Sequence, residues 1–179
     1  GPEKPALLED LEARGLQNAA QLTGAVDPDA IPGLLASMDV ACAPYPDLSD
    51  FYFSPLKVYE YMAAGRPVVA SRIGQLADLI QHEVSGLLCP AGDAGALAAA
   101  LQRLRDRPDL RRRLGTAARE TVQRKHTWKS VVGRLLNLAG VDHAPSPARR
   151  GRARPGARDV PRAVPPVVAS QPFPIPGGR

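Results

Sequence analysis

The sequence predicts an α/β domain built on a parallel sheet, and three observations support this fold class. Short apolar segments alternate with longer helical segments as far as about residue 139. The apolar segments are short and rich in aliphatic residues, as expected for buried parallel strands joined by helical crossovers. Proline, glycine and short polar residues stand where the helices should begin and end.

Each element follows from these local patterns. The predicted strands are residues 19–22, 40–43, 67–70 and 86–89. The predicted helices are residues 5–14, 27–38, 55–64, 74–81, 94–105, 108–124 and 128–139. Asp27-Pro28 and Ser54-Pro55 each place a favoured N-cap residue before a proline, which is typical of a helix start. Asp78 and Asp93 are interpreted as capping or surface residues.

The positive charge is unevenly distributed. The chain has 179 residues and a formal net charge of +5. Residues 143–179 hold seven arginines, one aspartate and nine prolines, whereas residues 1–142 carry a net charge of −1. We therefore predict a globular domain over 1–142 and a disordered Pro/Arg-rich tail over 143–179, because the tail cannot bury enough apolar surface to fold. A basic, nucleic-acid-binding domain is not expected, and neither is a specific nucleic-acid partner.

Other features exclude several classes of site. Cys42 and Cys89 each lie in an apolar segment, so both are predicted to be buried thiols. Three histidines without clustered partners, His82 among them, do not predict a metal site. No apolar run reaches the roughly 18 residues needed to span a bilayer, and no signal peptide opens the chain. A reducing, cytoplasmic setting is therefore expected.

The strongest candidate for function is the predicted helix start at Ser54-Pro55-Leu56-Lys57, which follows a buried strand. The first-turn amides of Leu56 and Lys57 have no partner within the helix, and the helix dipole is positive there, so an anion such as phosphate should bind. The Lys57 ammonium adds a full charge. Glu60 lies one turn further on, where its carboxylate could accept hydrogen bonds from two adjacent hydroxyls of a ribose. The alternative is a surface ion pair between Lys57 and Glu60.

The segment SPLKVYEYMAAGRPVVAS resembles the donor-binding segment of group 1 (family 4) glycosyltransferases. Further stretches resemble this family in order and with normal spacing: TGAV, DVACAPYP, Ile73-Gly74, HEVSGLLCPAGDAGALAAAL, LGTAAR and His126-Thr127-Trp128. The resemblance covers about residues 1–139. It implies a Rossmann-like parallel sheet flanked by helices, the C-terminal half of the GT-B architecture.

The resemblance also implies roles for individual residues. Glu60 corresponds to the family's ribose-binding Glu, and Leu56 and Lys57, next to Ser54, correspond to its diphosphate-binding positions. Gly24 and Val26 would lie near the base. Tyr52 stands where the family often has an earlier Glu, so the two-Glu pattern is incomplete. Tyr52, Phe53 and Gly74 are candidates for contact with the sugar, although Gly74 could instead serve only as a turn.

The implied reaction moves a sugar from a nucleoside-diphosphate sugar to an acceptor, with retention, and neither a cofactor nor a metal is required. GPEKPALLEDL resembles a turn inside the donor domain. We therefore expect a fragment that lacks its N-terminal domain, contains no certain catalytic residue and is inactive alone.

Alternatives remain at this point. One is a non-catalytic nucleotide-binding or scaffold module. Another is a membrane-associated protein led by its basic tail. Residues 103–125 carry a net charge of +6. This stretch is either a solvated helix face or a surface for an anionic membrane, on which the protein would be peripheral at the inner face.

Overall fold

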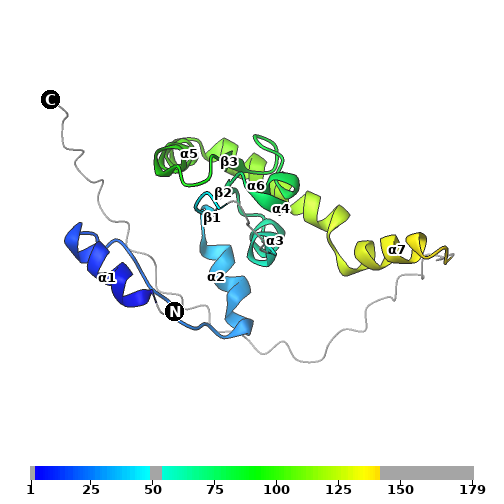
Figure 1. Ribbon diagram of the computed structural model, residues 1–179, viewed down its shortest axis with the longest axis horizontal. Coiled ribbons are helices and arrows are strands. Elements are labelled where there is room, and N and C mark those ends of the chain that lie inside the picture. Colours follow the sequence, from blue (N-terminus) through cyan, green and yellow to red (C-terminus); the bar gives the residue numbers. More distant parts are fainter. Residues whose placement is uncertain (1–2, 49–53, 142–179) are drawn as a thin grey trace. The chain divides into compact units, whose positions relative to one another are not determined.

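The computed structural model describes residues 3–48 and 54–141. Its centre is a three-stranded parallel sheet of β1 (Ala41–Ala43), β2 (Val68–Ser71) and β3 (Leu87–Cys89), in the order β1-β2-β3 (Figure 1). Ala41 pairs with Val68, and Val69 pairs with Leu87. The predicted α/β class with a parallel sheet is confirmed. The predicted tail over 143–179 lies outside the described residues.

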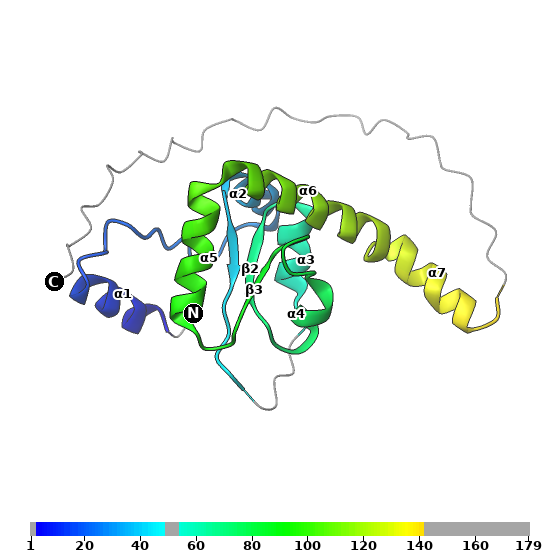
Figure 2. The ribbon, with the colours of Figure 1, turned by 90° about the horizontal axis from the view of Figure 1, so that it is seen from above.

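Helices follow each strand, as the crossover pattern predicts. The helical elements are α1 (Lys4–Ala13), the 3₁₀ turn η1 (Pro28–Ala30), α2 (Ile31–Ser37), α3 (Leu56–Ala63), α4 (Gly74–Leu79), α5 (Ala94–Asp106), α6 (Pro108–Lys125) and α7 (Trp128–Leu138). Figure 2 shows α5 on one side of the strands and α3 and α4 on the other. The Asp93 carboxylate caps α5 by accepting the Ala96 amide at 2.8 Å, which confirms its predicted capping role.

The core lies on both faces of the sheet, because successive residues of a strand point to opposite faces. On one face Val68 and Ala70 pack with Val58 and Met62 of α3. On the other face Val69 packs with Leu87, Cys89, Leu104 of α5 and Leu110 and Leu114 of α6. This burial holds the start of α3 against the carboxyl end of the sheet.

One predicted strand is wrong, and one predicted helix is present but subdivided. Residues 19–22 form no strand and are exposed, because a strand needs a hydrogen-bonded neighbour and the described sheet contains only β1, β2 and β3. The predicted helix over 27–38 is divided into η1 and α2. The Asp27 carboxylate does cap the start of η1, since it accepts the Asp29 amide at 2.9 Å.

The amino ends of the strands are closed by tight packing and by arginines. The Arg66 guanidinium donates to the carbonyls of Met38 at 2.9 Å and Ala36 at 3.3 Å, which joins the segments that precede β1 and β2. Gly115 of α6 faces Gly65, and a Cβ at Gly115 would overlap the Gly65 carbonyl oxygen. Only glycine therefore permits this approach of α6 to the end of α3.

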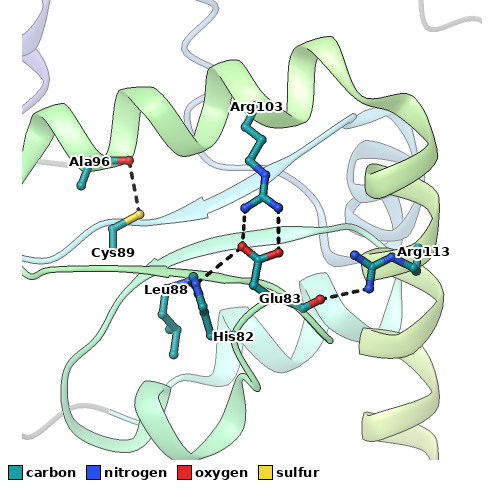
Figure 3. A network of polar contacts seen from close by, with 7 residues as sticks. All are labelled: His82, Glu83, Leu88, Cys89, Ala96, Arg103 and Arg113. Atoms are coloured by element: carbon teal, nitrogen blue, oxygen red, sulfur yellow. Dashed lines mark hydrogen bonds and ion pairs between the residues drawn. The ribbon is translucent and has the colours of Figure 1, made fainter.

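A second set of contacts, which we call the Glu83 clamp, holds the loop before β3 (Figure 3). Glu83 has a positive φ of 66°. Its carboxylate accepts two hydrogen bonds from Arg103 of α5, and Arg113 of α6 donates to its carbonyl at 3.0 Å. The hydrogen bonds from Arg103 lower the pKa of the Glu83 carboxyl. His82 accepts the Leu88 amide at 2.9 Å through Nδ1. Part of the basic stretch 103–125 is therefore structural.

Candidate functional site at the carboxyl edge of the sheet

The loops that leave the carboxyl ends of the three strands are tied together. The Ser71 hydroxyl accepts the Tyr45 amide at 2.8 Å and donates to the Tyr45 carbonyl at 2.9 Å. The Gly92 amide donates to the same carbonyl at 3.0 Å, and the Arg72 amide donates to Cys89 at 2.7 Å. These bonds fix Tyr45 at the edge where parallel sheets bind their ligands.

A hollow of about 280 Å³ opens beside these loops. It is lined mainly by apolar side chains: Pro44, Tyr45, Pro46, Ala70, Ser71, Cys89, Pro90, Gly92, Asp93, Ala94 and Leu97. Cys89 is buried, as predicted, whereas Cys42 is half-buried. Burial raises the pKa of both thiols, which disfavours the nucleophilic thiolate form. Cys89 is therefore not an activated thiol nucleophile in this hollow.

The start of α3 brings Lys57 and Glu60 to this same edge. Val58 and Met62 are fully buried in the core, and this orientation leaves Lys57 and Glu60 exposed one turn apart. The Lys57 Nζ lies 4.9 Å from the centroid of the Tyr45 ring. Such a cation–π contact restrains the ammonium without neutralising it. Since Tyr45 is held by Ser71 and Gly92, the position of Lys57 is linked to all three strand ends.

Lys57 and Glu60 do not pair with each other. Among residues 3–48 and 54–141, neither side chain takes part in an ion pair, and the Glu60 carboxylate accepts no hydrogen bond. The alternative of a surface ion pair is therefore not what the structure contains. Both charges are available to a ligand.

The details of the helix start differ from the prediction. Pro55, not Ser54, is the N-cap residue, and no side chain caps α3. Pro55 has φ −80° and ψ 43°, a turn conformation in which the Leu56 amide donates to the Ser54 carbonyl at 2.9 Å. The Leu56 amide is thus already bound within the chain, and the expectation of a free donor there is wrong for this conformation. Ser54 is exposed beside this turn.

The other predicted site residues are distributed over several loops. Gly74 begins α4 after β2, with a positive φ of 48°, so it shares the carboxyl edge with Lys57. Gly24 has φ +68° and lines a separate hollow of about 810 Å³ between residues 21–25 and α1. Val26 is half-buried nearby in the sequence. Tyr52 and Phe53 lie outside the described residues.

Sequence reasoning missed Ser71 and Tyr45. The only signals were a serine at the end of the apolar segment VVAS and an aromatic residue two positions after β1.

No cluster of three or more His, Cys, Asp or Glu suited to a metal occurs within the described residues. No described helix is long and apolar enough to cross a membrane.

Comparison with known proteins identifies the family of this chain. A family model described as "Glycosyl transferases group 1" matches residues 1–107, which include β1, β2, β3 and α3. The phosphatidyl-myo-inositol mannosyltransferase of Mycobacterium leprae is 35% identical over 127 residues, 71% of this chain and 33% of that protein. The MMP alpha-(1->4)-mannosyltransferase of Mycolicibacterium hassiacum is 34% identical over 124 residues, 68% of this chain and 29% of that protein.

Solved structures agree with this assignment. Sucrose-phosphate synthase from Thermosynechococcus elongatus has a TM-score of 0.67 and 30% identity, covering 78% of this chain and 34% of that one. HepE from Anabaena, solved with UDP, shares the fold at a TM-score of 0.63 and 24% identity, with 78% of this chain and 38% of that chain covered. The chain spans about a third of the length of the curated relatives named above. From the family match and these relatives, the chain belongs to the group 1 glycosyltransferases.

Proposed function

We propose that the chain is the donor-binding part of an enzyme that transfers a sugar from a nucleoside-diphosphate sugar to an acceptor, with retention at the anomeric carbon. The observation that carries this proposal is the pair of exposed, unpaired charges of Lys57 and Glu60 at the carboxyl edge of the sheet. Their separation by one helical turn suits a ligand with a diphosphate next to a sugar bearing adjacent hydroxyls.

Lys57 acts on the leaving group. When the bond between the anomeric carbon and the diphosphate oxygen breaks, negative charge develops on the diphosphate. A cation held in place before the reaction stabilises that charge without a cost of reorganisation. The Tyr45 ring, 4.9 Å from the Lys57 Nζ, provides this restraint. The Lys57 backbone amide, in the first turn of α3, adds a second donor.

Glu60 binds the nucleoside. A carboxylate has two oxygens and can accept one hydrogen bond from each of two neighbouring hydroxyls, as a ribose presents them. Such charge-assisted bonds are stronger than neutral ones. Glu60 therefore positions the donor, while Lys57 stabilises the charge that develops in the reaction.

The relatives support the reaction class. Two of them are mannosyltransferases by name, and the solved structure of HepE contains UDP. Because this chain spans about a third of such proteins, we expect it to bind a nucleoside diphosphate weakly and to transfer no sugar by itself. The acceptor site and further diphosphate contacts would come from an N-terminal domain.

The test is calorimetric titration of the 179-residue chain with UDP, GDP and ADP in buffer containing EDTA. We expect one of them to bind without added metal. Glu60→Gln and Lys57→Gln should each weaken that binding by about 1–3 kcal/mol, the value of a lost charge-assisted hydrogen bond. Sugar transfer from the corresponding donor should be absent.

Matched variants away from the edge serve as controls. Glu120→Gln and Lys125→Gln remove the same charges from exposed positions on α6 and should leave nucleotide affinity unchanged. Failure of all three nucleotides to bind would favour a scaffold module without a donor site. Binding that survives both Glu60→Gln and Lys57→Gln would place the nucleotide elsewhere on the chain.

A further inference from the structure

A further hollow, lined mainly by polar groups, lies between α4 with the loop after it and the second half of α6. Its volume is about 220 Å³, which corresponds to the space of about seven water molecules. Asp78, Gln81 and Ser85 line it from α4 and the loop, and Thr121 and Lys125 line it from α6. A hollow of this size admits a small molecule, because drug-sized ligands occupy larger pockets.

The α6 side of the hollow is positively charged. Arg124, Lys125 and His126 line it together. Basic residues are common in the last turn of a helix, where they offset the helix dipole, so their place in the sequence does not by itself indicate a site. Within the described residues, however, Lys125 forms no ion pair, and Arg124 has only an exposed contact of 3.6 Å with Glu120. Most of this charge is therefore available to a ligand.

The ionisation of His126 reflects the same positive charge. The pKa of His126 is lowered by burial first and then by Arg134 and Lys125. On its other side the imidazole packs against the Tyr59 ring of α3, with the two ring centroids 5.0 Å apart. Asp78 of α4 is the carboxylate that shares the hollow with His126. An anion bound beside these cations would favour the charged imidazolium and raise the pKa of His126 again.

The α4 side of the hollow offers hydrogen-bonding groups. Ser85 is 2% exposed, and its hydroxyl accepts the Gln81 amide at 3.0 Å. Among the described residues this hydroxyl donates to no acceptor, so its proton is left for a ligand. The Asp78 carboxylate forms no ion pair with the described residues, the cations across the hollow included. One end of the hollow thus suits an anion, and the other suits a hydroxyl group.

We propose that this hollow binds a small phosphate monoester that also carries a hydroxyl group. The phosphate lies against Lys125 and His126, which donate charge-assisted hydrogen bonds to it. The ligand hydroxyl donates to the Asp78 carboxylate, and the Ser85 hydroxyl donates to a ligand oxygen. The site lies apart from Lys57 and Glu60, so the proposal does not depend on nucleotide binding at the carboxyl edge.

Two features favour a small ligand over a charged surface as the occupant. Cations alone would attract an anionic bilayer or an acidic protein equally well. The Ser85 donor, however, is almost fully buried, where a flat surface does not reach it. Asp78 would repel either kind of acidic surface, whereas the hydroxyl group of a small ligand satisfies its carboxylate.

The experiment follows the imidazole signals of the full chain by proton NMR. The chain has three histidines, and His126→Gln identifies the relevant signal. At constant ionic strength, glycerol 3-phosphate should shift the His126 signal saturably and raise its pKa. Sulfate, a dianion whose charge does not change between pH 5 and 8, should do the same with lower affinity. Sodium chloride and glycerol should have no such effect, and the His82 signal should not respond to any of them.

Substitutions test the two ends of the hollow separately. Lys125→Gln should weaken the binding of glycerol 3-phosphate by about tenfold, as expected for a lost charge-assisted hydrogen bond. Asp78→Asn removes a repulsion, so sulfate should bind up to about fivefold more tightly. The same change should reduce the preference for glycerol 3-phosphate over sulfate. Lys4→Gln and Asp39→Asn remove the same charges from exposed positions outside the hollow and should bind like the parent chain.

Several outcomes would overturn the proposal. One is a His126 signal that does not respond to glycerol 3-phosphate, or that responds equally to chloride. Another is unchanged affinity in Lys125→Gln. Displacement of sulfate by vesicles containing phosphatidic acid, more effectively than by glycerol 3-phosphate, would assign these cations to a lipid surface. Stronger displacement by polyglutamate would assign them to an acidic protein.

Discussion

At the amino ends of the three strands, Arg66 and Arg103 end on partners inside the fold, whereas Lys57 and Glu60 at the carboxyl edge form no ion pair within the described residues. Arg66 is bound to the carbonyls of Ala36 and Met38, and Arg103 to the carboxylate of Glu83. At the other edge, Lys57 rests on the Tyr45 ring, and Glu60 makes no side-chain hydrogen bond or ion pair within the described residues. Both edges belong to the same three-stranded sheet.

This contrast separates charges that build the domain from charges that serve a ligand. A charge whose partner lies within the fold contributes to stability and has little left to offer a substrate. The unpaired charges stand at the edge where parallel sheets bind ligands, next to loops already fixed by Ser71 and Gly92. Substitutions at the amino edge should therefore change stability alone, and those at the carboxyl edge should change binding.

The largest effect is expected from Gly115→Ala, which breaks the amino edge at its tightest contact. The new Cβ would overlap the Gly65 carbonyl, so α6 must move away from α3. Overpacking of this kind should lower the free energy of unfolding by about 3 kcal/mol. Urea unfolding followed by circular dichroism measures the change.

Gly133→Ala is the matched control for that experiment, because it makes the same change in a helix where nothing lies within 4 Å. Alanine is the better helix former, so this variant should be as stable as the parent chain or more stable by up to about 1 kcal/mol. Equal losses from Gly115→Ala and Gly133→Ala would show that α6 does not pack closely on Gly65.

The next largest effect is expected from Ser71→Ala at the carboxyl edge. Ser71 is 5% exposed and makes two hydrogen bonds to the backbone of Tyr45, so its loss should destabilise the domain by about 1–3 kcal/mol. Because the Tyr45 ring restrains the Lys57 ammonium, nucleotide affinity should fall as well. This loss should be measurable in buffer in which the variant is fully folded. Stability lost with no change in affinity would make Ser71 purely structural.

Ser71 also shows where sequence reasoning succeeds and where it ends. The seven α-helices and three strands of the described residues follow from periodicity, prolines and glycines, because those patterns act locally. The predicted strand over 19–22 is wrong because a strand depends on a hydrogen-bonded neighbour. The predicted N-cap role of Ser54 is wrong because the turn at Pro55 moves the start of the helix. Lys57 and Glu60 could be placed as neighbours on one helix turn. The bonds between Ser71 and Tyr45 join residues 26 positions apart, which no local pattern encodes.

A smaller effect comes from two substitutions of Glu83, whose φ of 66° suits glycine. Glu83→Ala loses the contacts with Arg103 and keeps the unfavourable backbone conformation. Glu83→Gly loses the same contacts and removes the strain. Glu83→Gly should therefore be more stable than Glu83→Ala by about 1 kcal/mol in thermal or urea unfolding. Nucleotide affinity should not change in either variant, because the Glu83 clamp lies at the amino edge.

The smallest effect is the pH dependence of that clamp. The hydrogen bonds from Arg103 lower the pKa of Glu83 from its ordinary value of 4.5. A carboxyl whose pKa is lower in the folded state adds stability above 4.5, and this stability is lost as the pH falls through the folded-state value. The Glu83 side chain is 39% exposed, so solvent screening limits the contribution to about 1 kcal/mol or less.

Comparison of the parent chain with Glu83→Gln separates the contribution of the Glu83 charge to stability from the contributions of the other carboxyl groups. The parent should be the more stable of the two at pH 7, and the difference should shrink steadily below pH 4.5 in urea unfolding. A difference that stays constant down to pH 3 would mean that the Glu83 charge does not stabilise the fold. The amino edge would then depend on glycine packing and on the arginine contacts with backbone carbonyls, and the contrast between the two edges would be one of shape more than of charge.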